Sequence, residues 1–283
     1  RVLFALQQGA HFHLLTTESE YSTTPFIDHY VQLDDDAAAA AFYQAALVPM
    51  VDTAEERTLL ERVRAWNKRN PKRRIHLAGH DIEHDYPTTI THVLAPYFRR
   101  LDPELELEVA DFEQDGLGFI AELEALVVRA RKARTVGDYP FVTADFIATV
   151  VQNLRSKHLA GHVDHIYYRQ RAIVRNLTDP AYLGRWFRTG KVMLWGGSYH
   201  TQTRRVFPDG GAFLREGIYL ATEHKPTRGK TYSISVVGLA LSLGDMAGAD
   251  PAKLGHMGDG YRGTLARFQR AHAAGAITAD EAH

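Results

Sequence analysis

The feature that most limits what this chain can fold into is the alternation of short apolar runs with long segments of helical spacing. Three of the runs cover 11–17, 74–78 and 191–195, and the last one stops at Gly196-Gly197. Short runs rich in β-branched and aromatic residues that end at glycine are typical of buried strands. Strands that alternate with helices of ten or more residues predict an α/β fold, in which a largely parallel central sheet is flanked by helices.

Helix signals fill the segments between the runs. Thr53 to Glu56 forms a capping box, which predicts the start of a helix there. Its buried stripe is expected at Leu59, Leu60, Val63 and Trp66. Further helices are predicted over 34–47, 88–100, 119–134 and 143–176, the last with a break at Ala160-Gly161, and further strands over 217–221 and 231–237.

The domain organisation follows from where the strands fall. Residues 1–101 and 163–283 carry the predicted strands, so we expect them to form the N-terminal and C-terminal parts of one α/β core. Residues 102–162 show helical spacing only. They are therefore predicted to form a mainly helical insertion into that core.

Composition excludes several classes of function. The absence of cysteine rules out disulfides, thiolate nucleophiles and cysteine-based zinc sites. A formal net charge of −1 gives no indication of nucleic acid or an anionic membrane as a partner. No window approaches the roughly 18 to 20 apolar residues of a membrane span. We therefore expect a cytoplasmic protein that acts on a small molecule, without a metal or cofactor and without nucleic-acid or membrane partners, and the oligomeric state stays open.

Polar residues follow each of the three runs. Because ligands of open α/β sheets bind at the carboxyl ends of strands, these residues predict one shared site. The alternative for each group is a solvated turn. The residues are Glu18 and Glu20 after the first run, His80 and Asp81 after the second, and Ser198, Tyr199 and His200 after the third.

The segment 79–85 adds a second alternative, because it holds two histidines and three acids. These residue types coordinate metal ions in many proteins. Their irregular spacing here matches no standard ligand set, so no metal site is predicted. Asp81 lies closest to the end of the strand and is the member expected to face a pocket.

Three pairs of segments, in this order along the chain, resemble the erythromycin esterase family, which is related in fold to the haem-binding ChaN group. The first pair is similar to the family's strand that ends in Glu and its helix that closes on Tyr-Val, and the second to its W/L-R-x-x-N helix and G-x-D strand end. The third is similar to its R-D-x-x-M-A-x-N-L helix and its strand that ends in W-x-H-N-x-H. The pairs are 12–21 with 27–31, 63–67 with 75–81, and 169–177 with 191–200.

The resemblance implies ester hydrolysis in a carboxylate-rich cleft, with a histidine as general base on water and no covalent serine intermediate. Neutral imidazole accepts a proton near pH 7, and a cationic donor stabilises an oxyanion. By position, Glu18, Arg169 and His200 match catalytic residues, and Asp81 matches the acid of G-x-D. From their positions after the strands, Asp81, His80, Ser198, Tyr199 and Glu20 are expected to lie against the substrate.

Several positions depart from the family pattern. The family's G-E-x-x-H motif, which carries its proposed general base, would lie upstream of Arg1. Either this motif precedes Arg1 or the protein lacks it. Because the sequence opens on Arg1 and not on Met, the natural N-terminus is expected ahead of this residue. Gly197 replaces a histidine of the H-N-x-H motif, Ser198 replaces its asparagine, and Gln170 replaces the aspartate of R-D. Two functions stay open: hydrolysis of a carboxylic ester or macrolactone, or a diverged role in which the fold binds a small molecule or haem, or catalyses a different reaction.

Overall fold

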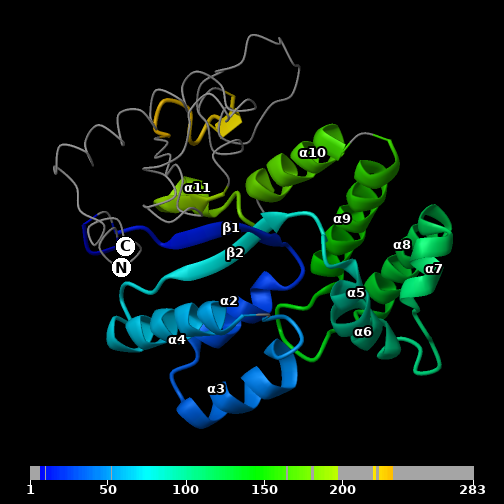
Figure 1. The fold of residues 1–283 in the computed structure, drawn as a ribbon, viewed down its shortest axis with the longest axis horizontal. Coiled ribbons are helices and arrows are strands. Elements are labelled where there is room, and N and C mark those ends of the chain that lie inside the picture. Colours follow the sequence, from blue (N-terminus) through cyan, green and yellow to red (C-terminus); the bar gives the residue numbers. More distant parts are fainter. Residues whose placement is uncertain are drawn as a thin grey trace, which may run out of the picture.

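The centre of the molecule is a parallel sheet of three strands, covered by helices (Figure 1). The computed structural model of the protein describes residues 7–9, 11–51, 53–163, 165–179, 182–196, 219–220 and 223–231. In these residues the sheet has the order β2-β1-β3, formed by β1 (Leu14–Glu20), β2 (His76–Asp81) and β3 (Val192–Trp195). Both pairings of the central strand β1 are parallel. The predicted α/β class with a parallel sheet flanked by helices is confirmed.

Helices make up most of the rest of the described chain. Two of them, η1 and η2, have π-helical hydrogen bonding and continue directly from α-helical turns. In chain order the elements are α2 (Thr24–Gln32), α3 (Asp36–Phe42), η1 (Tyr43–Leu47), α4 (Ala54–Arg69), α5 (Tyr86–Thr88), η2 (Thr89–Leu94), α6 (Ala95–Arg99), α7 (Val109–Gln114), α8 (Gly116–Ala133), α9 (Ala144–His162), α10 (His165–Thr178) and α11 (Trp186–Thr189).

The helices form two groups around the sheet. In Figure 1, α2, α3 and α4 lie together below β2, whereas α5 to α9 gather at the right-hand end and α10 lies above the strand tips. Both α2 and α10 contact β2, and α8, α9 and α10 pack in series. The main core joins the aromatic and aliphatic side chains of both groups, so the predicted insertion packs on the sheet through shared core residues.

Two strands extend further than the apolar spacing predicts. Prediction ended the first strands at residues 17 and 78, whereas β1 continues to Glu20 and β2 to Asp81. The backbone pairing continues because Glu20 lies opposite Asp81, after a register shift that follows Thr17. Glu18 and Glu20 therefore lie within β1 and not in a loop. The acids near the ends of these strands contact residues from other elements, described below. The spacing of apolar residues in the sequence does not reveal these contacts.

The prediction of a strand over 217–221 is wrong at the two residues that the structure describes there. Tyr219 and Leu220 are helical. The carbonyl of Tyr219 accepts from the backbone N–H groups of Glu223 and His224, at 2.9 and 3.0 Å, which is a helical and not a strand pattern. The other strand predicted in this part of the chain, over 231–237, lies outside the described residues except for Thr231, which the structure does not place in a strand.

Helix α4 begins where the capping box predicts, but its buried face differs. Leu60, Val63 and Asn67 are buried, at spacings of three and four residues. Leu59 is 42 % exposed, because one residue is a turn of about 100° on a helix. The predicted break in the long helical segment also moves, since α9 runs through Gly161 and ends at His162.

The cap of α4 gives a test of this boundary. Thr53 Oγ1 accepts from the backbone N–H of Glu56 at 3.0 Å. Replacing Thr53 by alanine is expected to lower the free energy of unfolding by about 1 kcal/mol, because the helix loses a partner for one of its first N–H groups. Thr58→Ala in the same helix is the control, since the Thr58 hydroxyl only donates to the carbonyl of Ala54. Urea unfolding that shows equal stability for both variants would contradict the assignment.

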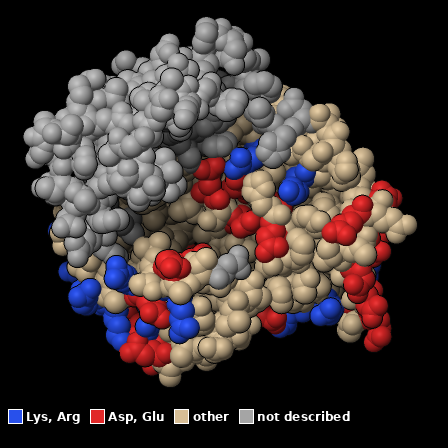
Figure 2. All heavy atoms as spheres, viewed as in Figure 1, with Lys and Arg blue, Asp and Glu red and all other residues tan. Residues whose placement is uncertain are grey.

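Charged side chains are distributed unevenly over the surface. Figure 2 shows acidic and basic side chains interleaved at the lower left, where Figure 1 places α3 and α4, and acidic ones along the right-hand edge near α7. Asp36 at the start of α3 accepts from both Arg64 and Lys68 on α4, which explains the interleaving. None of the helices in the described part of the chain has the length and apolar character needed to cross a bilayer.

Candidate active site

The three strands bring their carboxyl ends to one edge of the sheet. Thr17 of β1 lies opposite Gly79 on one side and Trp195 on the other. A β carbon at Gly196, just beyond β3, would lie 3.0 Å from Glu18 Oε2, so the end of β3 passes close to this carboxylate. The edge predicted from the sequence therefore exists, and Glu18 faces its centre.

Gly79 explains how β2 approaches its neighbours so closely at this edge. A β carbon on Gly79 would overlap the Thr24 hydroxyl and the backbone carbonyls of Glu20 and Ser19. The Thr24 hydroxyl also donates to the carbonyl of Glu20 at 2.6 Å, which ties the start of α2 to the end of β1. Glycine is therefore required at this position for β1, β2 and α2 to meet, two residues before Asp81.

Arg169 on α10 joins the two strand-end acids. Its Nε donates to Asp81 Oδ1 and Oδ2 at 3.0 and 3.1 Å, and its Nη2 donates to Asp81 Oδ2 at 2.5 Å. The same Nη2 donates to Glu18 Oε1 at 3.0 Å. Residues 88 and 151 positions apart in the chain thus form one cluster of two carboxylates and a guanidinium, called here the Arg169 cluster.

The charges of the cluster are fixed by its surroundings. The side chain of Asp81 is 1 % exposed, and those of Arg169 and Glu18 are 19 % and 22 % exposed. Burial alone would raise the pKa of Asp81, but hydrogen bonds from His84 and Arg169 outweigh it and hold the pKa well below its usual range. Asp81 is therefore ionised at neutral pH, while Glu18 and Arg169 retain contact with solvent.

His84 is a member of this edge that the sequence did not single out. Its Nε2 lies 3.2 Å from Asp81 Oδ2, and the ring is partly exposed. The signal was present in the concentration of His and acids over 79–85, which was interpreted as a possible metal set. Among the described residues, no group of three or more His, Asp and Glu side chains is placed to hold a metal ion.

The remaining predicted residues fall into two sets. His80 is fully buried, and its Nδ1 lies 2.8 Å from the Thr16 hydroxyl, on the face of β2 opposite Asp81. Glu20 accepts from the backbone N–H of Asp85 at 3.2 Å at the rim of the edge. Neither has a described contact with Arg169, and their roles toward a substrate stay predictions. Ser198, Tyr199 and His200, like Gly197, lie outside the described residues.

A second buried acid, Glu83, was also missed. It lies two residues beyond Asp81 and is fully buried. The Ser22 hydroxyl donates to Glu83 Oε2 at 2.6 Å, and Thr89 and Asn153 donate to its oxygens at 3.2 and 3.4 Å. Burial raises the pKa of Glu83 to about 8 in spite of these hydrogen bonds. Glu83 thus joins the turn after β1 to the segment after β2 as a neutral acid at pH 7.

In chemical terms the edge combines a buried ionised carboxylate, a more accessible carboxylate, a guanidinium that contacts both of them, and an imidazole that contacts the buried one. Such a set can orient a water molecule and stabilise negative charge that develops on a carbonyl oxygen. A neutral Glu83 behind it supports the backbone that presents Asp81 and Glu20.

The chain is similar to known proteins in sequence and in fold. A family model described as erythromycin esterase matches residues 8–218. Two solved structures are similar. The first is a Bacillus cereus protein with 17% sequence identity and a TM-score of 0.47, and the match covers 81% of this chain and 59% of that one. The second is a mutant of the erythromycin esterase EreC in its open conformation, with 14% sequence identity and a TM-score of 0.44, and the match covers 80% of this chain and 63% of that one. The chain spans less than two thirds of the length of either structure. No curated protein matches it.

Proposed function

Because the chain belongs to the erythromycin esterase family, we propose that it hydrolyses a carboxylic ester or macrolactone by adding water at the Arg169 cluster. The observation that carries the proposal is the guanidinium of Arg169, held between Glu18 and Asp81 at the carboxyl edge of the sheet. This cation fits a site where negative charge develops during a reaction.

The proposed roles follow from burial and charge. Asp81 is the buried anion that orients Arg169, so Asp81 is a positioning residue. Glu18 is the more accessible carboxylate and orients the attacking water. Arg169 stabilises the oxyanion that forms on the ester carbonyl. His200, which matches the last histidine of the family's W-x-H-N-x-H motif, is assigned here as the base that accepts the proton of that water.

The reaction balances with water as the only co-reactant. The water oxygen bonds to the carbonyl carbon while its proton passes to the base, which gives a tetrahedral oxyanion. The bond between the acyl carbon and the alcohol oxygen then breaks, and the proton returns to the leaving alkoxide. The products are a carboxylic acid and an alcohol, or one hydroxy acid from a macrolactone.

A substrate panel tests this proposal. The complete protein is incubated with macrolides and simple esters, and mass spectrometry looks for products that gain 18 Da, or for the separated acid and alcohol. We expect turnover by the parent protein and a fall of at least about 100-fold in kcat/KM for Glu18→Gln and for His200→Ala. Glu124→Gln is the control, because Glu124 is an exposed acid that pairs with Arg155 on α9. Its kcat/KM should match that of the parent.

Substitution of Gln170 for the family's aspartate favours the second candidate, a diverged protein that binds a small molecule or haem. Gln170 is buried beside Arg169 on α10, where an acid would add a negative charge. If folded protein shows no product across the panel, the diverged function replaces the hydrolase, and titration with haem becomes the next measurement.

A further inference from the structure

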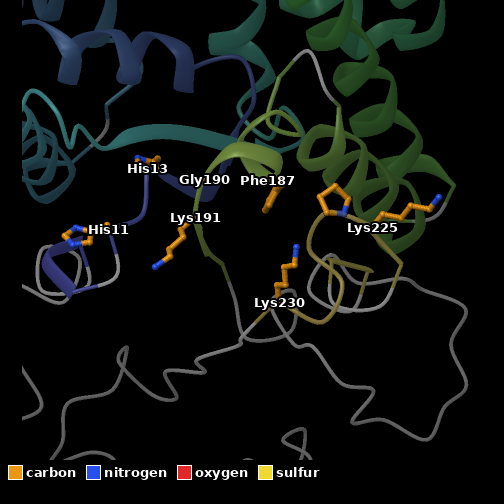
Figure 3. A pocket seen from close by; sticks show the side chains of 8 residues that line it. His11, His13, Phe187, Gly190, Lys191, Lys225 and Lys230 are labelled. Carbon is orange, nitrogen blue, oxygen red and sulfur yellow. The ribbon is translucent and has the colours of Figure 1, made fainter.

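A concave site lies at the edge of the sheet opposite the Arg169 cluster, where β1 and β3 begin. It is an open hollow of about 790 Å³. Figure 3 shows the residues that line it coming from three separate segments: His11 and His13 just before β1, Phe187 and Lys191 just before β3, and the turn that carries Lys225 and Lys230. None of these residues belongs to the Arg169 cluster.

The segments that form this hollow are fixed to one another and to the core. The backbone N–H of His13 donates to the carbonyl of Lys191 at 2.9 Å, which joins the starts of β1 and β3. The Thr227 hydroxyl donates to the carbonyl of buried Leu220 at 2.6 Å and lies 2.9 Å from His224 Nδ1. The lysine-bearing turn is therefore anchored before any ligand arrives, which reduces the entropic cost of binding.

The described lining of the hollow is basic. It contains three lysines and two histidines and no acid. Lys225 and Lys230 form no ion pair with any residue of the described chain, whereas Lys68, Arg74 and Arg155 elsewhere on the surface each pair with an acid. A concave surface that carries charges of one sign concentrates ions of the opposite sign. The hollow is thus suited to an anion.

The side chains in Figure 3 divide the hollow into a central and a peripheral part. Lys230 points toward Phe187, and Lys225 lies beyond it with its side chain directed outward. Phe187 packs edge to face on His224, with ring centroids 5.7 Å apart, so its ring has a fixed orientation. A cation next to an aromatic ring is suited to a ligand with two parts: an anionic group that binds the cation and a flat apolar group that lies on the ring.

We propose that this hollow is a binding site for a small phosphate-bearing organic molecule, with its phosphates at Lys191 and Lys230 and its apolar or aromatic part against Phe187. The site is separate from the edge that carries the proposed hydrolysis. Loss of either function therefore leaves the other intact. Lys225 is at the rim and contributes long-range attraction more than contact.

Titration of the complete protein with inorganic tripolyphosphate and with ATP, both without metal ions, tests the proposal. We expect both probes to bind, and ATP to bind more tightly because its base can lie on Phe187. Lys230→Ala should weaken both by about tenfold or more, the loss expected for a hydrogen bond to a charged group. Phe187→Ala should remove the advantage of ATP over tripolyphosphate.

Arg228→Ala is the matched control, because Arg228 is exposed on the same turn but does not line the hollow. It should change either affinity less than twofold. NMR of the imidazole protons gives a readout that needs no variant, since signals of His11 and His13 should shift on titration. Absence of binding and of shifts at about 1 mM of both probes, or equal losses in Lys230→Ala and Arg228→Ala, would overturn the proposal.

Discussion

Replacing Arg169 by methionine is expected to lower the free energy of unfolding by about 3 to 5 kcal/mol, and to reduce kcat/KM for ester hydrolysis by at least about 100-fold. Methionine keeps much of the side-chain volume but removes the charge. Asp81 would then remain as a buried carboxylate without its guanidinium partner, and Glu18 would lose its contact to α10. Both effects follow from the same missing group.

A double-mutant cycle separates the two effects. Asp81→Asn combined with Arg169→Met removes both members of the buried ion pair, so stability should recover by more than half of the loss, while hydrolysis should stay abolished. Arg171→Met, two residues along α10, is the control, because Arg171 is exposed and its described partner is the Tyr167 hydroxyl at 2.8 Å. Urea unfolding in which Arg169→Met and Arg171→Met are equally stable would show that the cluster is not an ion pair of the folded state.

The second large effect is a dependence of stability on pH that one residue controls. Burial raises the pKa of Glu83 from the ordinary 4.5 to about 8 in the folded protein. Below pH 4.5 the carboxyl group is protonated in both the folded and the unfolded protein, and its contribution to the free energy of unfolding is fully present. Between about pH 4.5 and 8 only the unfolded chain ionises, so the folded state binds more protons and loses roughly 1.4 kcal/mol of stability per pH unit from this group. Above pH 8 the loss levels off.

Glu83→Gln removes the titrating proton but keeps an amide that can hydrogen-bond to Ser22 and Thr89. We therefore expect the stability of Glu83→Gln relative to the parent to increase as the pH is raised from 5 to 8, in total by about 4 kcal/mol. Glu124→Gln, at an exposed acid, is the control substitution of the same chemical kind. Urea unfolding at several pH values measures the stability of both variants and the parent. A difference in stability between Glu83→Gln and the parent that does not change with pH would mean that Glu83 is ionised in the folded protein.

The parts of the fold that are predictable from sequence are those set by local pattern. Apolar runs located all three strands of the described sheet, and the Thr53 cap located the start of α4. The ends of β1 and β2 were missed because their last residues are acids. Such residues remain in strands only through partners contributed by distant segments, and no local pattern encodes those partners.

The site was predictable to the same degree. Strand-end position and family resemblance singled out Glu18, Asp81 and Arg169, and the structure brings these three together. Their distances and the permanent charge of Asp81 depend on how α10 packs on β2. Glu83 was not predictable as a buried neutral acid, because its burial depends on Ser22, Thr89 and Asn153, which come from three other segments.

The measurement that tests the account most directly is hydrolysis of the ester panel by the complete protein in water enriched in ¹⁸O. If water adds at the Arg169 cluster, the product acid carries one ¹⁸O and the alcohol none. Labelled acid should form with the parent and with Arg171→Met, and should be lost in Glu18→Gln and Arg169→Met. Labelled acid that forms equally well in all four proteins, or its absence with every substrate from folded parent protein, would contradict the proposed hydrolase site.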